Sequence, residues 1–136
     1  MKSGGAGSRK KRTAVKTKHA PAPGGHYSQA ISSGGHIYVS GSGPFHPGTH
    51  KIVGENIETQ TRQTLKNIQA ILQAAGASLG DVVKVTVYLR DMRDFDAMDG
   101  VYKSFFPKDP PARTTVEVGL YGAERLLAVD AEAVKR

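Results

Sequence analysis

The residue best suited to grip a charged ligand is Arg113, in the segment PPARTTVEV at residues 110–118. The prolines Pro110 and Pro111 restrict the backbone before it, and the β-branched residues after it predict a strand. An arginine at the start of a stiff strand can direct its planar guanidinium at a carboxylate and form two parallel hydrogen bonds. An exposed arginine at a strand end is the alternative, and this segment alone does not decide between them.

A second candidate is Asp130, in the predicted last strand at residues 126–134. It alternates with Ala128 and Glu132 on one face, while the opposite face is apolar. On this pattern alone, a polar face turned to solvent is the better interpretation.

Several other chemistries find no support in the sequence. There is no phosphate-binding loop, no GxSxG nucleophile elbow and no dinucleotide fingerprint. The absence of cysteine excludes thiolate nucleophiles and thiolate metal sites. His46 and His50 flank a Pro-Gly-Thr loop without an acidic residue, which favours solvated histidines over a metal site. We expect neither a metal nor a cofactor.

The charge is unevenly distributed along the chain. The net charge is +7, from nineteen basic and twelve acidic residues, and seven of the basic residues lie in residues 1–20, which contain no acid. The remaining twelve basic residues balance the twelve acidic ones, so the body is neutral. We predict a disordered basic arm over residues 1–20 and one domain over residues 21–136. The arm could contact nucleic acid non-specifically, or be a solubilising extension, a targeting segment or an expression remnant.

Neither a membrane span nor a secretory signal is predicted. No apolar run approaches the roughly 20 residues that cross a bilayer, and the N-terminus lacks the apolar stretch of a signal peptide. Together with the lack of cysteine, this predicts a cytoplasmic protein.

The hydrophobic spacing predicts the order ββαβαββ. A helix is expected to begin after Asn56 as N-cap and to stop at Gly76, and a second to begin at Asp94. In the central strand, Val83, Val85, Val87 and Leu89 are expected to face one way. The predicted elements are strands 27–32 and 36–40 around a turn at 33–35, helix 57–75, strand 82–90, helix 94–105, and strands 113–118 and 126–134.

Crossover connections should place both helices on one face of a single α+β sheet. The other face would then be bare. Because much of it is expected to be small or apolar, it predicts a subunit interface.

Seven further segments accompany the arginine segment in a fixed order. The segments are YSQAI at 27–31, VSG at 39–41, QTRQTLKNI at 60–68, AAG at 74–76, DVVK at 81–84, DMRDF at 91–95 and AVKR at 133–136. With these segments, the chain resembles the RidA/YjgF family of reactive-intermediate deaminases, also called the liver perchloric-acid-soluble protein family, from about residue 20 to its end.

The resemblance implies a chorismate-mutase-like fold, a homotrimer with sites in the clefts between subunits, and hydrolysis of 2-aminoacrylate-type enamines or imines to 2-oxo acids and ammonia. Arg113 would bind the substrate carboxylate, and Asp130 would hold the attacking water in place of the family's usual glutamate. The resemblance implies further substrate contacts from Tyr27, Ser40, Gly41, Asp99 and Thr115. Asp99 stands where relatives often have an amide, and Thr115 where a cysteine often stands.

Two alternatives remain open from the sequence. The first is a trimeric module that binds a small carboxylate or keto acid through Arg113 without catalysis, because Asp130 is one methylene shorter than glutamate. The second is an RNA-binding or ribonuclease-type protein. The neutral body argues against the second, since the excess charge lies in residues 1–20.

Overall fold

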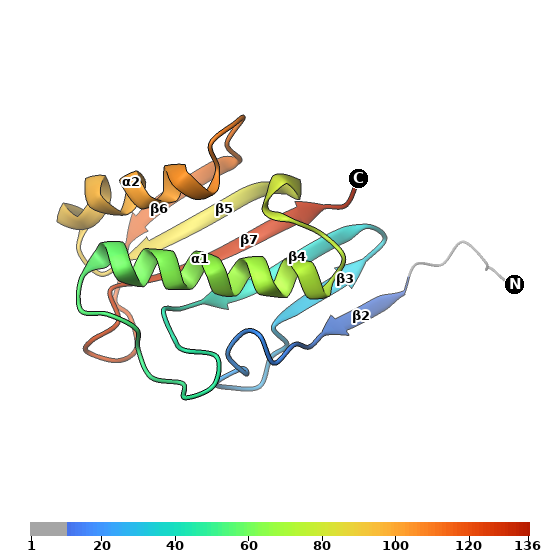
Figure 1. The fold of residues 1–136 in the computed structure, drawn as a ribbon, viewed down its shortest axis with the longest axis horizontal. Coiled ribbons are helices and arrows are strands. Elements are labelled where there is room, and N and C mark those ends of the chain that lie inside the picture. The colour runs from blue at the N-terminus through green and yellow to red at the C-terminus, as the bar shows by residue number, and fades with distance from the viewer. Residues whose placement is uncertain (1–10) are drawn as a thin grey trace, which may run out of the picture.

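The computed structural model describes residues 11–136, which form one six-stranded sheet with two helices against one of its faces (Figure 1). The strands lie in the order β2-β3-β4-β7-β5-β6, and only the β5–β6 pairing is parallel. The predicted α+β arrangement is therefore confirmed, with one additional strand. The elements are β2 Arg12–Val15, β3 Ala30–Ser33, β4 His36–Ser42, α1 Ile57–Ala74, β5 Val82–Leu89, α2 Phe95–Phe105, β6 Ala112–Glu117 and β7 Leu127–Val134.

The additional strand corrects the prediction of a disordered arm over residues 1–20. Strand β2 pairs antiparallel with β3, from Arg12 opposite Ser33 to Val15 opposite Ala30. Val15 and Ala20 are buried in the core, at 7% and 2% exposure. The prediction is thus wrong for residues 12–20, because β2 belongs to the sheet and Val15 and Ala20 to the core; residues 1–10 lie outside the described part.

Helix α1 begins and ends where its capping residues predict. The Asn56 side chain accepts a hydrogen bond from the Thr59 N–H at 2.8 Å, and Gly76, just after the helix, has φ +81°, which favours glycine. Two polar residues on the buried face of α1 anchor loops. Gln60 donates to the carbonyls of Gly54 and Glu124, and Asn67 donates to those of Gly43 and Phe45.

Strand β5 departs from the predicted alternation at its start. A register shift against β7 lies between Val82 and Lys84, so Val82 points into the core while Val83 is 48% exposed. Beyond the shift, Val85, Val87 and Leu89 are fully buried as predicted. The bulge turns the Val83 side chain toward solvent and leaves the alternation of the later residues unchanged.

The start of α2 also differs from the prediction. Asp94 makes no capping hydrogen bond; instead Asp91 accepts from the Arg93 N–H at 2.9 Å and begins a short 3₁₀ turn that runs into the helix. Within α2 the most buried residues are Met98, Tyr102 and Val101.

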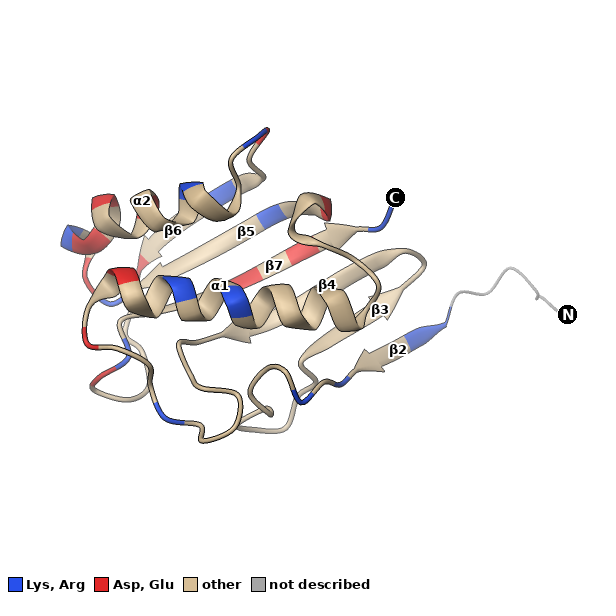
Figure 2. Cartoon of the chain, viewed as in Figure 1, with Lys and Arg blue, Asp and Glu red and all other residues tan. Residues whose placement is uncertain are grey.

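The core lies between the sheet and the two helices, and the opposite sheet face is more polar than predicted. That bare face carries Lys84, Thr86 and Tyr88 from β5, beside Asp130 and Glu132 from β7. Figure 2 shows a basic segment on β5 and acidic segments on the adjacent β7. Exposed Tyr38, at 46%, extends it on β4. Within residues 11–136, no helix is long and apolar enough to cross a membrane.

Candidate active site

Arg113 lies near the start of β6, an edge strand of the sheet, and its side chain contacts residues of α2. Its Nη1 donates to Asp99 Oδ1 at 2.7 Å, and the two side chains are 19% and 26% exposed. The guanidinium carbon is 4.6 Å from the centroid of the Tyr102 ring and 5.4 Å from that of Phe95. Two aromatic rings and a carboxylate therefore fix this cation, and the bond to Asp99 is the one hydrogen bond found from its five N–H donors among the described residues.

Thr115 shares this face of the sheet. It pairs with Val87 and Arg113 pairs with Val85, and both valines are fully buried beneath the helices. The structure therefore brings together three of the predicted site residues, Arg113, Asp99 and Thr115, at one edge of the molecule.

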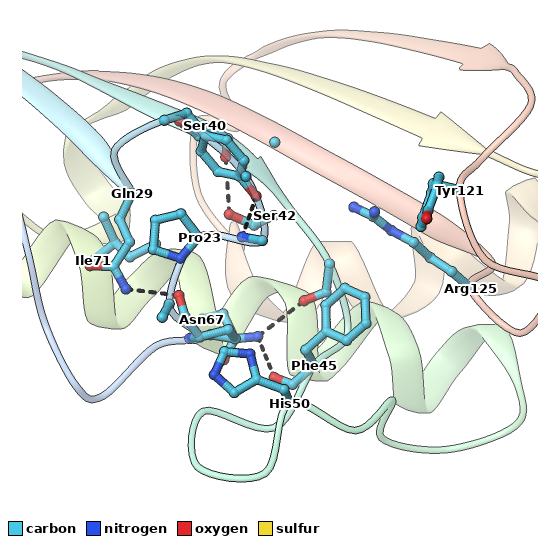
Figure 3. A pocket seen from close by; sticks show the side chains of 17 residues that line it. Pro23, Gln29, Ser40, Ser42, Phe45, His50, Asn67, Ile71, Tyr121 and Arg125 are labelled. Atoms are coloured by element: carbon cyan, nitrogen blue, oxygen red, sulfur yellow. Dashed lines mark hydrogen bonds between the residues drawn. The ribbon is translucent and has the colours of Figure 1, made fainter.

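Tyr27, Ser40 and Gly41 line a separate cavity of about 430 Å³. The cavity lies among β4, the Pro21–Gly25 segment, the loop after β4 and α1, and Figure 3 shows its lining side chains. Ser40 is held by bonds from its Oγ to the Ser28 carbonyl, at 2.6 Å, and from its N–H to the Gln29 carbonyl, at 3.0 Å. A register shift in the β4–β7 pairing falls between Val39 and Ser42, so Ser40 and Gly41 lie at an irregularity in the strand.

Asp130 occupies a third place, on the bare face of the sheet. It pairs with Thr86, and its Oδ2 accepts a hydrogen bond from the Tyr88 hydroxyl at 2.8 Å. This bond raises the pKa of Tyr88, with a smaller contribution from burial. Because Arg113 projects from the other face, one chain does not bring the predicted carboxylate-binding residue and the predicted water-holding residue together.

The histidines of the loop after β4 have local roles. His46 Nδ1 accepts from the backbone N–H groups of Gly48, at 3.0 Å, and Thr49, at 3.2 Å. His50 lines the cavity with φ +62°. Among the described residues, no group of three or more histidine or acidic side chains is arranged to hold a metal ion.

The sequence interpretation missed Arg125 as a residue of the cavity. Its Nε donates to the Leu127 carbonyl at 3.1 Å, and its guanidinium carbon lies 5.4 Å from the centroid of the Phe45 ring. The only sequence signal is a charged residue just before an apolar strand, which equally fits an exposed turn. The roles of Gln60 and Asn67 in holding loops had a clearer sequence signal, because both are polar residues on the apolar face of a predicted helix.

Fold and site together define an α+β protein that presents a rigid, ring-flanked arginine at a sheet edge and a separate polar cavity. The chain matches the sequence model of the family described as endoribonuclease L-PSP over residues 17–135. It is 50% identical over 119 residues to a RutC family protein of Pyrococcus horikoshii, covering 88% of this chain and 94% of that one.

Two further relatives carry information about function. The 2-iminobutanoate/2-iminopropanoate deaminase of Salmonella typhimurium is 38% identical over 125 residues, 90% of this chain and 97% of that protein. The crystal structure of TdcF from Escherichia coli with bound serine superposes with a TM-score of 0.86 at 35% identity, covering 91% and 99% of the two chains. The chain therefore belongs to the RidA/YjgF family, as its motifs predicted, and among its relatives are proteins named as deaminases.

Proposed function

We propose that this protein hydrolyses 2-aminoacrylate-type enamines and their imines to 2-oxo acids and ammonia. The observation that carries the proposal is Arg113, held in place by Asp99 and by the Tyr102 and Phe95 rings. A guanidinium fixed in this way loses little conformational freedom when it binds a carboxylate. The deaminase name of the Salmonella relative and the amino acid bound to TdcF support a small carboxylate as the ligand.

The chemistry needs little from the protein beyond orientation and proton transfer. The enamine takes a proton on carbon to become the imine, and water adds to the C=N carbon. The resulting carbinolamine loses ammonia as the C–N bond breaks, leaving the C=O group of the 2-oxo acid. Arg113 would hold the substrate carboxylate through two hydrogen bonds, while a carboxylate base takes a proton from the attacking water.

The proposal includes a homotrimer with the site between subunits. Arg113 lies at the β6 edge, the cavity lies beyond β4 on the other side of the sheet's centre, and Asp130 lies on the bare face. These places can contribute to one site only if residues of different copies meet. Light scattering at micromolar concentration should give three times the 14.5 kDa chain mass; a stable monomer would remove the shared site.

Asp130 is proposed to hold the water, and two substitutions test this role. Aspartate is one methylene shorter than glutamate, so its carboxylate would lie further from the attacking water. Asp130→Glu should then raise kcat while leaving KM nearly unchanged, because the longer side chain stabilises only the transition state. Asp130→Asn should lower kcat about 100-fold or more while ligand affinity stays nearly intact. The measurement is 2-oxo acid release from enzymatically generated 2-aminoacrylate, with Glu132→Gln as the control on the same strand face.

A non-catalytic carboxylate-binding module is the second candidate, and the Tyr88–Asp130 hydrogen bond favours it. An Asp130 oxygen already occupied by a phenol, at 2.8 Å, has less capacity to orient water. On this alternative both Asp130 substitutions leave any turnover unchanged, while Arg113 variants still lose ligand binding. The same assays therefore separate the enzyme from the module.

A further inference from the structure

Arg125 is the one arginine or lysine among the lining residues of the cavity, and these residues include no acidic side chain. Its side chain is partly buried, and Figure 3 shows its guanidinium pointing into the cavity. Within residues 11–136 the arginine–carboxylate ion pairs involve Arg93, Arg113 and Arg136. Arg125 is thus a partly buried cation with no carboxylate partner in the described part of the chain, which is unusual because buried charges are normally paired.

The guanidinium of Arg125 is held in place from two sides. The Phe45 ring lies on one side, with its centroid 5.4 Å from the guanidinium carbon. Gly43 lies close on another side: a Cβ there would come within 3.0 Å of Arg125 Nε and Nη2 and 2.7 Å of Phe45 Cε2. Any side chain at position 43 would therefore displace the guanidinium or the ring, so glycine is what permits this packing.

The loop that carries Arg125 is also fixed. Arg90, just after β5, donates from Nε to the Arg125 carbonyl at 2.7 Å and from Nη2 to the carbonyls of Leu120, at 3.1 Å, and Gly122. Gln60 binds the same loop from α1, accepting from the Leu126 N–H at 2.8 Å. Arg125 itself uses its Nε for the Leu127 carbonyl, and no hydrogen bond from its two terminal nitrogens is found within residues 11–136.

Electrostatics at this position favours an anion. Burial is the main effect that lowers the pKa of Arg125, because a desolvated cation is destabilised; the Tyr27 phenol opposes this shift, and the charge of nearby Arg90 adds to it. A bound carboxylate would stabilise this cation through its opposite charge. The lining also offers the hydroxyl of Tyr27, which accepts from the Gly24 N–H and keeps its own hydrogen for a polar ligand. The two serine hydroxyls of the lining already donate to backbone carbonyls.

We infer that the Arg125 cavity is a second carboxylate-binding site that selects ligands with an acidic side chain. This inference rests on the proposed function, and it makes 2-imino acids with a second, side-chain carboxylate the favoured substrates. Arg113 of one subunit binds the carboxylate next to the imine, and Arg125 of another subunit binds the distal carboxylate. In the absence of catalysis, the cavity still binds a dicarboxylate.

The test compares two five-carbon probes, 2-oxoglutarate and 2-oxopentanoate, which differ in the distal carboxylate. Calorimetric titration of the full chain should show 2-oxoglutarate binding at least about tenfold more tightly, the gain expected from one charged hydrogen bond. The preference should shrink at high salt. Equal affinity for the two probes, or no binding of either, overturns the inference without any variant.

Variants then locate the preference. Arg125→Gln should bring the affinity for 2-oxoglutarate down to that for 2-oxopentanoate, and Gly43→Ala should weaken the preference while the arginine is kept. The matched control is Arg93→Gln, which removes one positive charge from a side chain that is 91% exposed; it should leave the preference unchanged. A preference that survives Arg125→Gln assigns the distal carboxylate to another residue and overturns the inference.

The two proposals fail in distinguishable ways. If monocarboxylic imines are hydrolysed and the probes show no preference, the Arg125 inference fails and the deaminase proposal stands. If the preference is present and depends on Arg125 but no imine is hydrolysed, the cavity inference stands and the deaminase proposal fails.

Discussion

Arg113 and Arg125 are two partly buried arginines in different surroundings. Arg113 has a carboxylate partner, Asp99, at 2.7 Å and an aromatic ring within 5 Å of its guanidinium carbon. Arg125 has one ring, one backbone carbonyl and no carboxylate partner among the described residues. The first cation is compensated before any ligand arrives, whereas the second is not.

This difference separates orientation from charge. The Asp99 carboxylate fixes the direction of the Arg113 guanidinium but cancels part of its charge. Arg113 should therefore orient a bound carboxylate well while adding less to the affinity than an uncompensated arginine would. Arg125 is oriented by backbone, glycine and ring contacts that leave its charge intact. Substitutions that remove charge and substitutions that remove orientation should therefore act differently at the two places.

The largest expected effect is the loss of Arg113. Arg113→Ala should lower kcat/KM for 2-oxo acid release at least about 100-fold, because two charged hydrogen bonds to the substrate are lost. Arg113→Lys should rescue poorly, since a point ammonium cannot form the paired bonds. Arg93→Ala is the control for removing a surface arginine. Nearly full activity in Arg113→Lys would contradict a two-pronged grip.

Removing the compensating charge should have a smaller and opposite effect. Asp99→Asn keeps an oxygen that can accept from Arg113 but removes the negative charge, so affinity for a monocarboxylate should rise about three- to tenfold. Titration with 2-oxobutanoate measures it, with Asp91→Asn at an exposed ion pair as control. A fall in affinity would mean that the carboxylate is needed to orient the guanidinium.

The rings beside Arg113 can be tested through Tyr102, whose hydroxyl is buried without a hydrogen-bond partner in the described structure. Tyr102→Phe keeps the ring over Arg113 and removes an unsatisfied polar group, so the free energy of unfolding should rise by up to about 1 kcal/mol. Urea unfolding measures this change. A clear loss of stability would show that the hydroxyl has a partner in the assembled protein.

The smallest effect is expected at the Arg136–Asp81 pair, in which an arginine side chain that is 78% exposed joins the C-terminus to the turn before β5 at 2.9 Å. Arg136→Gln should lower the free energy of unfolding at pH 7 by less than about 1 kcal/mol. The hydrogen bond from Arg136 is the main cause of the lowered pKa of Asp81. The stabilisation is therefore fully present when the pH is above the ordinary pKa of 3.8, and it is lost as the pH falls through the lower pKa of the folded state. Urea unfolding at pH 7 and pH 3 should show the difference shrinking; a constant difference would contradict the linkage.

Local patterns in the sequence were sufficient for most of the fold. The three- and four-residue spacing placed α1 within a residue of its observed bounds, because Asn56 and Gly76 satisfy the helix ends through short-range contacts. The alternation of residues gave the buried faces of β7 and of β5 beyond its bulge, because successive side chains of a strand point to opposite faces. The family motifs led to Arg113 and to the RidA/YjgF assignment, since they depend on residue types in order along the chain.

What only the tertiary structure decided are contacts between residues distant in the chain. The pairing of β2 with β3, the bulge that exposes Val83, and the ion pair between Arg113 and Asp99 each depend on a partner that no local pattern specifies. The same is true of Arg125, an ordinary loop arginine in the sequence. Its place in a cavity follows from Gly43 and Phe45, about eighty residues earlier, and from Arg90 fixing its loop. Sequence patterns report the face on which a side chain lies; the packing of distant segments determines which group it meets there.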